Sequence, residues 1–201
     1  MTKLFWVDLE TTGTQPGHEI TECAFIIEIN GKVKSERNIL VRPLAIDPNN
    51  VESGVVRPID DEALAITGCS VEDLKSSGRI SGKELYRSLL DVVETYVDKF
   101  NRDDKFIMAG HNVSFDQRFL KALWDQCGDQ YFGSWFFWET LNLLDVVKVW
   151  QVVIGKRLES KKLSDIAEYF GIPLEKHQAI NDIKATRDLF YQMLSEIRST
   201  S

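Results

Sequence analysis

The stretch FWVDLETTG, Phe5–Gly13, ends an apolar run with two carboxylates one residue apart. In a β-strand, Asp8 and Glu10 would point to one face of a sheet, and Val7 and Leu9 would point to the other. Burying an ionised carboxylate without a partner costs several kcal/mol, and a second carboxylate beside it adds repulsion. The pattern therefore indicates that a cation completes this end of the strand.

The composition fits one globular domain over residues 1–201, because 43% of the side chains are apolar. With 24 basic and 31 acidic side chains the formal charge is −7, so binding to nucleic acid would need a local device rather than a broad basic surface. The three cysteines include no CxxC pair, which favours a reducing compartment. The N-terminal stretch lacks the features of a signal peptide or membrane span, so we expect a cytoplasmic protein without membrane contact.

Strand and helix patterns follow one another as in an α/β domain. Strands are expected at residues 3–9, 19–30, 33–42 and 105–110, with a hairpin turn at Asn30-Gly31. Helical spacing favours helices at residues 60–66, 81–100, 114–126, 140–154, 162–170 and 179–197. Helix 114–126 could begin with a capping box of Ser114 and Gln117, or with Asn112 as the cap. The order of elements predicts a mixed sheet covered on both faces.

The last predicted helix carries two aspartates that periodicity separates. At about 100° per residue, Asp182 lies roughly 60° from the centre of the apolar arc, whereas Asp188 lies roughly opposite that centre. We therefore expect Asp182 to face the interior and Asp188 to be solvated. His177 precedes Asp182 by five residues, where a loop can aim its ring at the same place.

A fourth carboxylate, Asp116, falls in the first turn of the helix that follows a buried strand. An acid in a first turn gains from the helix dipole alone, so a structural role and a functional role both fit this position.

Three motifs, VDLETTG, GHNVSFD and HQAIND, resemble in order and separation the motifs of the DEDDh, or DnaQ-like, family of 3′-to-5′ exonucleases. This family includes the proofreading epsilon subunit of bacterial DNA polymerase III and ribonuclease T. The resemblance runs from about Leu4 to Phe190, and ALAITGCSVEDL and LSDIAEYFGIP add secondary similarities. It departs at Gln178, where arginine is common, at Asn181, and in a longer loop from Pro43 to Asp60. These departures leave the acids in place and leave substrate preference open.

The resemblance implies a ribonuclease H-like fold with a mixed five-stranded sheet flanked by helices. It implies that four acids gather at one end of the sheet and hold two Mg²⁺ or Mn²⁺ ions, namely Asp8, Glu10, Asp116 and Asp182. Oxygen ligands of this kind suit such hard cations. His177 would act as general base, taking the proton from the attacking water. A hydrogen-bonding, purely structural histidine is the alternative.

Residues beside the first two motifs would hold the substrate end, according to the same resemblance: Thr11, Thr12, Gly13, Asn112 and Phe115. Phe115 could stack on a base, or it could belong to the core. For the aromatic cluster at residues 135–141, core and rim packing is favoured over base stacking. His18 and His111 match no usual zinc-ligand spacing, so a zinc site is not expected.

The leading prediction is thus an enzyme that releases nucleoside 5′-monophosphates from single-stranded or frayed 3′ ends. DNA is favoured slightly over RNA, since the first motif resembles the proofreading branch. Two other classes fit less well, a non-catalytic nucleic-acid-binding module of the same fold and a structural domain that binds cations. Little chain follows the last helix, so we expect no polymerase-tethering tail; oligomeric state stays open.

Overall fold

The computed structural model of the protein describes residues 1–46, 58–174 and 178–200. Six strands form one sheet in the order β4-β3-β2-β1-β5-β6. Their bounds are β1 Lys3–Thr11, β2 Ile20–Ile29, β3 Lys32–Arg42, β4 Ile80–Ser81, β5 Phe106–Gly110 and β6 Phe136–Asn142. Strands β1, β2 and β3 are antiparallel neighbours, whereas β5 runs parallel to β1 and to β6. The mixed α/β fold is confirmed, with one strand more than expected because β4 pairs briefly with β3.

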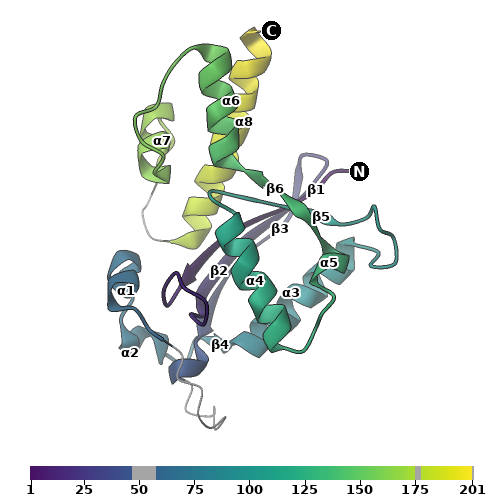
Figure 1. Ribbon diagram of the computed structural model, residues 1–201, viewed down its shortest axis with the longest axis vertical. Helices are drawn as coiled ribbons and strands as arrows, with labels where there is room; N and C mark the ends of the chain where they lie inside the picture. Colours follow the sequence, from purple (N-terminus) through teal and green to yellow (C-terminus); the bar gives the residue numbers. More distant parts are fainter. Residues whose placement is uncertain (47–57, 175–177, 201) are drawn as a thin grey trace.

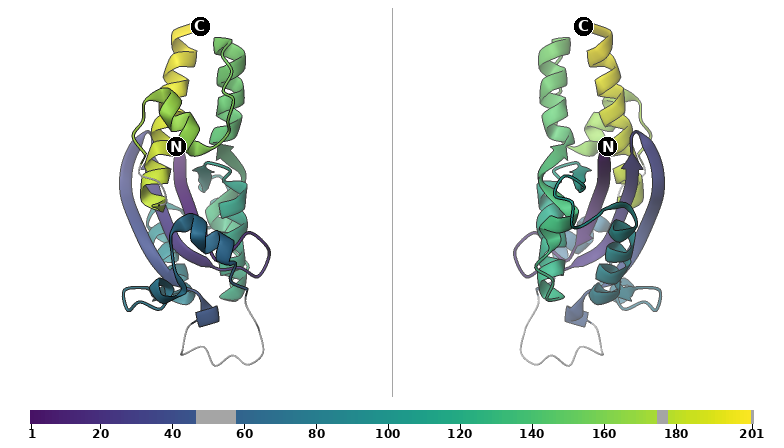
Figure 2. Two further views of the ribbon diagram at one scale, coloured as in Figure 1. Left: turned by 90° about the vertical axis from the view of Figure 1, so that its left-hand side faces the viewer. Right: turned by 90° about the vertical axis from the view of Figure 1, so that its right-hand side faces the viewer.

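Helices cover both faces of the sheet (Figures 1 and 2). They are η1 Leu44–Ile46, α1 Asp61–Thr67, α2 Val71–Leu74, α3 Gly82–Tyr96, α4 Ser114–Gln126, α5 Phe132–Trp135, α6 Leu143–Ile154, α7 Leu163–Phe170 and α8 Ala179–Thr200. Helices α3, α4 and α5 share one core with the sheet, and α6, α7 and α8 share the other. Figure 1 shows α6 beside α8, with the C-terminal turns of α8 extending beyond the sheet.

Strand β1 lies at the centre of both cores. Phe5 and Val7 are buried on the side of α3 and α4, while Leu4 and Trp6 are buried on the side of α8. The alternation follows from the period of two along a strand. It places Asp8, two residues after Trp6, on the α8 side of the sheet.

The hairpin expected between the second and third strands is confirmed. Asn30 and Gly31 join β2 to β3 with φ values of 51° and 76°. Positive φ at both turn residues is the geometry that Asn-Gly favours, because it matches the twist of the paired strands. The helix expected near residues 60–66 is likewise found as α1, whereas positions 47–57 of the long loop lie outside the described residues.

Three local predictions are wrong, and one of them is the helix expected over residues 81–100, because α3 already ends at Tyr96 and Val97 is extended. Residues 140–142 were expected to be helical, but they end β6, where Thr140 pairs with Met108 and Asn142 with Gly110. Pairing with β5 outweighs the local helical spacing, and helix α6 begins only at Leu143. The capping box is also absent: helix α4 has no side-chain cap at Val113, and Asn112 adopts a left-handed conformation instead.

The aromatic cluster at residues 135–141 divides between core and surface. Trp135 and Phe136 are buried against α4 and α5, whereas Trp138 is exposed and lies 6.2 Å from the Phe132 ring. Most of this cluster is therefore packing, as expected. Within the described parts of the chain, no helix combines the length and apolar character that crossing a membrane would require.

Candidate active site

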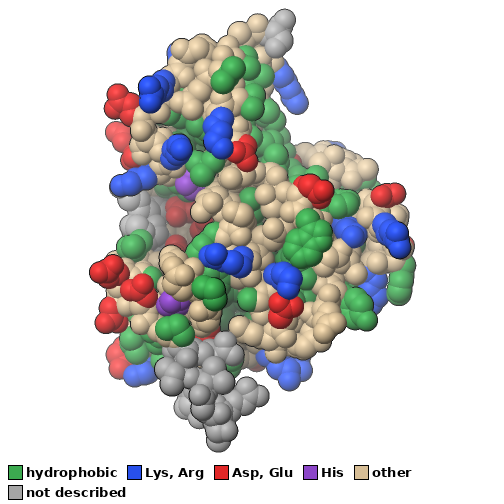
Figure 3. Space-filling model, viewed as in Figure 1, with side chains coloured by type: hydrophobic (Ala, Val, Ile, Leu, Met, Phe, Trp, Pro, Cys, Tyr) green, Lys and Arg blue, Asp and Glu red, His purple; other side chains and the backbone are tan. Residues whose placement is uncertain are grey.

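Three carboxylates meet where β1 ends. Asp8 and Glu10 leave the same face of β1, and Asp182 reaches them from the first turn of α8. One ligand oxygen of each lies within 4.8 Å of the others. Figure 3 shows acidic side chains in a hollow between the part of the molecule that contains α6–α8 and the part below it. The structure thus brings together three of the four predicted acids as a single group.

Helix α8 is held against the sheet by apolar packing and by hydrogen bonds that follow Asp182 along the helix. Its buried residues include Ile183 and Leu189, which pack in the same core as Trp6. Farther along, Glu28 of β2 accepts a hydrogen bond from Arg187 Nε at 2.6 Å and another from the Tyr191 hydroxyl. These contacts fix the rotation of the helix and turn Asp182 toward the sheet. As predicted, Asp188 faces solvent, with 61% of its side chain exposed.

Asp116 approaches β1 from the other side of the sheet. It lies in the first turn of α4, is only 3% exposed, and accepts a hydrogen bond from Leu9 N at 3.0 Å. Strand β5, which leads into α4, lies close to β1, and a Cβ on Gly110 would stand 2.7 Å from Val7 O. Glycine is therefore required for this approach, which brings Asp116 to the strand that carries Asp8.

The group is electrostatically unfavourable without a cation. Burial raises the pKa of Asp8 well above its ordinary value, and the charges of Asp116 and Glu10 raise it further. Burial followed by the charge of Asp182 raises the pKa of Glu10 to about 7. No lysine or arginine within the described ranges pairs with Asp8 or Glu10. Oxygen ligands with excess negative charge fit a divalent cation such as Mg²⁺ or Mn²⁺.

Glu22 is a fifth acid near this group, and the motifs did not predict it. It pairs directly with Glu10 across the β1–β2 ladder, at a register shift that leaves Thr21 as an extra residue on β2. Its charge contributes to raising the pKa of both Asp8 and Glu10. The available signal was an acid near the start of the largely apolar stretch ITECAFIIEI, and only the strand register connects it to the first motif.

Residues 5–190 match the exonuclease family represented by ribonuclease T. The chain belongs to the exonuclease family. The DEDDh, DnaQ-like resemblance expected from the motifs is thereby confirmed.

Solved structures share the fold of this exonuclease-family chain at low sequence identity. Exonuclease I of E. coli, in a zinc-bound complex with single-stranded DNA, is 17% identical with a TM-score of 0.75, over 98% of this chain and 41% of that one. Cell-death related nuclease 4 is 15% identical with a TM-score of 0.70, over 98% and 64% of the two chains. A 3′-exonuclease that recognises a histone mRNA stem-loop is 15% identical with a TM-score of 0.65, over 96% and 82%.

The chain spans about two fifths of the exonuclease I chain that it resembles, where the covered share is 41%. No curated protein sequence matches it.

The histidines of this exonuclease-family chain have different settings. The general-base candidate His177 lies outside the described residues. His111 Nε2 lies 2.9 Å from Lys161 O, and His18 Nδ1 lies 2.9 Å from Gln15 O. Neither joins a group with the spacing of metal ligands in the described part of the chain, where Asp8, Glu10 and Asp182 are the members of such a group.

The predicted substrate residues at the end of β1 and directly after it are buried, and their side chains bond within the loop. The Thr11 hydroxyl donates to Gly13 O at 2.8 Å. The Thr12 hydroxyl donates to Pro58 O at 3.1 Å and accepts from Glu19 N at 3.0 Å. A Cβ on Gly13 would lie 2.3 Å from the His18 ring. The Thr12 side chain thus stabilises the wall of the site, so any contact it makes with substrate would need this bonding to change.

The two substrate candidates of the second motif lie nearer the surface. Asn112 is exposed with a φ of 60°, and its N–H donates to Asn142 Oδ1 at 3.0 Å. Phe115 is partly buried, its ring centroid lies 4.8 Å from that of Phe119, and the Arg118 guanidinium lies 5.6 Å from it. The exposed part of Phe115 leaves both base stacking and core packing open for this side chain.

Proposed function

We propose that the chain is a metal-dependent 3′-to-5′ exonuclease that hydrolyses the terminal phosphodiester bond of single-stranded or frayed DNA and releases nucleoside 5′-monophosphates. One observation carries the proposal: oxygens of Asp8, Glu10 and Asp182 lie within 4.8 Å of one another, and no cationic side chain of the described residues pairs with the first two. Family membership supports nuclease chemistry, and the single-stranded DNA complexes among the similar structures support DNA.

Asp8, Glu10 and Asp182 would hold two Mg²⁺ or Mn²⁺ ions. Asp116, which reaches β1 from the other side, would be the fourth acid that holds them. When bound, such a pair neutralises charge on the phosphoryl and leaving oxygens and lowers the pKa of water. The protein's own contribution is placement. Helix α8 and strands β1 and β5 fix the acids before substrate arrives, so little reorganisation is needed during the reaction.

His177 is proposed as the general base that removes a proton from the attacking water. In the sequence it precedes the first residue of α8 by two positions, which ties it closely to the helix that carries Asp182. We expect His177→Ala to lower turnover by a factor on the order of a hundred, without changing the rise in melting temperature that Mn²⁺ produces. Unchanged turnover would reject this role.

The decisive experiment compares two aspartates of one helix. The wild type, Asp182→Asn and the matched control Asp188→Asn are incubated with 3′- and 5′-labelled DNA and RNA oligonucleotides, in Mg²⁺, Mn²⁺ or EDTA. Stepwise shortening from the 3′ end is expected for the wild type and Asp188→Asn, only with metal, and not for Asp182→Asn. Faster shortening of DNA supports the proposed substrate, whereas faster shortening of RNA replaces it. Equal activity of all three proteins would identify a contaminant.

Binding without shortening in every condition would support the non-catalytic module instead. In that outcome the carboxylate group would have a structural role. Asp182→Asn would then change the metal-dependent rise in melting temperature, and neither protein would shorten the oligonucleotides.

A further inference from the structure

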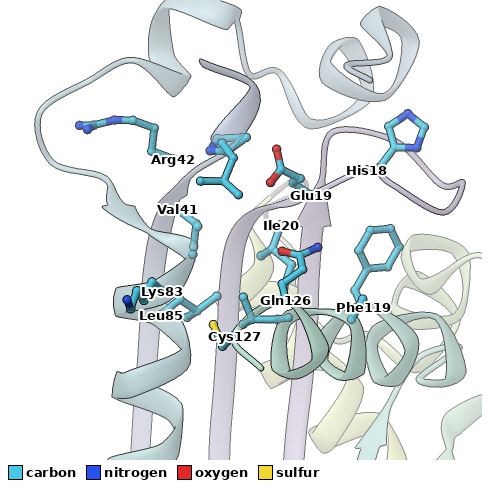
Figure 4. A pocket seen from close by; sticks show the side chains of 15 residues that line it. His18, Glu19, Ile20, Val41, Arg42, Lys83, Leu85, Phe119, Gln126 and Cys127 are labelled. Carbon is cyan, nitrogen blue, oxygen red and sulfur yellow. The ribbon is translucent and has the colours of Figure 1, made fainter. Parts of the chain in front are cut away.

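Helix α4 borders a second hollow besides the carboxylate group. Its first turn carries Asp116, and its later turns contribute Phe119, Leu123 and Gln126 to the lining of a cavity of about 660 Å³. The opposite lining comes from the start of β2, the end of β3 and the start of α3 (Figure 4). Ile20 and Leu85, in this lining, belong to the core on the α3–α4 side, so the cavity lies across the sheet from Asp8 and Glu10.

The cavity and the carboxylate group nevertheless share one edge of the sheet. Strand β1 ends there, β2 begins there and β3 ends there, because the three strands are antiparallel neighbours. Neighbouring strands are about 4.8 Å apart, so the end of β3 lies roughly 10 Å from the end of β1 along this edge. The loop that joins β1 to β2 carries Gly13, which packs on His18, a residue of the cavity lining.

The cavity has an aromatic end and a basic end, and between them lies the Glu19 carboxylate, which accepts a hydrogen bond from Ala45 N at 3.1 Å. His18 and Phe119 lie at one side in Figure 4, and Arg42 and Lys83 lie at the other. Arg118, the residue before Phe119 on α4, is exposed, donates to Thr14 O at 3.1 Å and lies with its guanidinium 5.8 Å from the Phe119 ring.

A neighbouring hollow of about 600 Å³ adjoins the basic end of this cavity. It shares Arg42 and Lys83 with the first, and Arg79 and Arg87 join them. Of its eight lining residues four are cationic and one, Glu84, is acidic, in a protein whose formal charge is −7. The Glu84 carboxylate is engaged by the Ser81 backbone and hydroxyl in the cap of α3. Positive charge is therefore concentrated at this end of an otherwise acidic protein.

Two arginines of this region donate hydrogen bonds to backbone carbonyls. Arg79 is structural, since it donates to Thr21 O at 2.7 Å and to Val41 O at 3.1 Å. Arg42 donates to Ser76 O at 3.0 Å, but its buried Nε has no hydrogen-bond partner among the residues that the structure describes.

Two further cations of this region face solvent. Lys83 and Arg87 are exposed one helical turn apart on α3, where no ion pair joins either to a described residue. Both side chains are therefore free to meet an incoming anion.

We infer that the basic groove, defined by His18, Phe119, Arg42, Lys83 and Arg87, binds the sugar–phosphate backbone of single-stranded nucleic acid upstream of the 3′ end held at the carboxylates. The inference rests on the proposed function. The cations can contact the phosphates, and the partly exposed His18 ring offers a face for a base, whereas Phe119 is only 6% exposed and belongs to the core. The position of the groove along α4 lets one strand pass from Asp116 over Arg118 to the cations of α3.

The test measures binding without catalysis. Asp8→Asn protein in EDTA is titrated with fluorescent single-stranded oligonucleotides of about 16 nucleotides at several salt concentrations. Each lost contact to a phosphate should reduce the slope of log affinity against log salt by about 0.7, so adding Lys83→Gln and Arg87→Gln should reduce it by about 1.4. Both side chains are exposed, so the fold should persist, and thermal melting verifies it.

The matched control removes the same charge elsewhere. Lys148→Gln with Arg198→Gln, on α6 and α8, should leave the slope within about 0.3 of the parent protein. Equal slopes for the two double variants would overturn the proposal. A second contrary result would come from an acidic peptide with the same charge as the oligonucleotide. The proposal would fail if that peptide displaced the oligonucleotide from the parent protein. Because the measurement needs no turnover, it separates failure of the groove from failure of the proposed hydrolysis.

A second readout uses the active protein. The groove variant should lower kcat/KM for oligonucleotides of about 16 nucleotides by roughly tenfold, while kcat/KM for those of about 4 nucleotides stays unchanged. Loss of activity on both lengths would assign Lys83 and Arg87 to the fold or the catalytic step rather than to the upstream strand.

Discussion

Two acidic sites lie along helix α8, and the protein treats them in opposite ways. Glu28 of β2 is 1% exposed, yet Arg187 and Tyr191 of the helix donate hydrogen bonds to it. Asp8 and Glu10 on the neighbouring strand lie near Asp182 of the same helix, and no described arginine or lysine pairs with these two acids. Arg187 therefore balances the charge of Glu28 within the chain, whereas no described lysine or arginine pairs with Asp8 or Glu10.

The contrast distinguishes a structural acid from a functional one. A buried carboxylate that serves the fold acquires a cation from the same chain, since an uncompensated buried charge costs several kcal/mol. At Asp8 and Glu10, with which no described lysine or arginine pairs, a bound metal would recover this free energy. The two sites thus predict opposite responses to the same kind of substitution.

The largest difference is expected in turnover. Asp8→Asn should lower kcat by a factor on the order of a thousand, because metals at such sites supply several kcal/mol of transition-state stabilisation. Glu28→Gln should change kcat by less than about tenfold wherever the protein stays folded, which circular dichroism would establish. Steady-state rates on a labelled oligonucleotide measure both. Comparable losses would mean that the two acids do not differ in role.

Stability should respond in the reverse direction. Glu28→Gln weakens a buried ion pair and should lower the free energy of unfolding by about 3 kcal/mol, measured by urea denaturation. Asp8→Asn should raise the free energy of unfolding in EDTA, since it removes one of several repelling charges. A destabilised Asp8→Asn protein would contradict the assignment of strain to the acidic site.

Metal should act at one site only. For the wild type, Mg²⁺ or Mn²⁺ at about 100 times its Kd should stabilise the fold by about 2.7 kcal/mol, and EDTA should reverse the gain. Glu28→Gln should show the same gain, while Asp182→Asn should lose most of it. Differential scanning calorimetry with and without metal provides the measurement. An equal gain in all three proteins would place the ion elsewhere.

The smallest effect concerns pH. Glu10 has a pKa of about 7 in the folded protein against an ordinary value of 4.5, so the folded state holds this proton more tightly than the unfolded state does. Its favourable contribution is present below about pH 4.5 and is lost as the pH rises through about 7. In EDTA at pH 8, Glu10→Gln should therefore be more stable than wild type, by on the order of 2 kcal/mol.

The same measurement at pH 4.5 should show little of this gain. Glu94→Gln, which neutralises an exposed acid on α3, serves as the control and should match wild type at both pH values. A gain that does not depend on pH would refute the linkage to Glu10.

The sequence predicted much of this arrangement where local patterns were strong. The motif VDLETTG follows strand periodicity, the arc of α8 separates Asp182 from Asp188, and Asn30-Gly31 specifies its own turn. Features that depend on pairing between strands far apart in the sequence were not predicted. Strand β6 takes residues 140–142 from the predicted helix because β5 is its partner, and Glu22 joins the acids only through the register with β1. The hydrogen bond from Leu9 to Asp116 likewise depends on how closely β5 approaches β1.

Thr12 links parts of the chain that are far apart in sequence. Besides its hydroxyl bonds to Pro58 and Glu19, its carbonyl accepts a hydrogen bond from the N–H of Asp60, the N-cap of α1. Helix α1 is therefore anchored two residues beyond Glu10, and a shift of this helix would pull directly on the end of β1. A ligand that displaces α1 would therefore also displace the end of β1, where Asp8 and Glu10 lie.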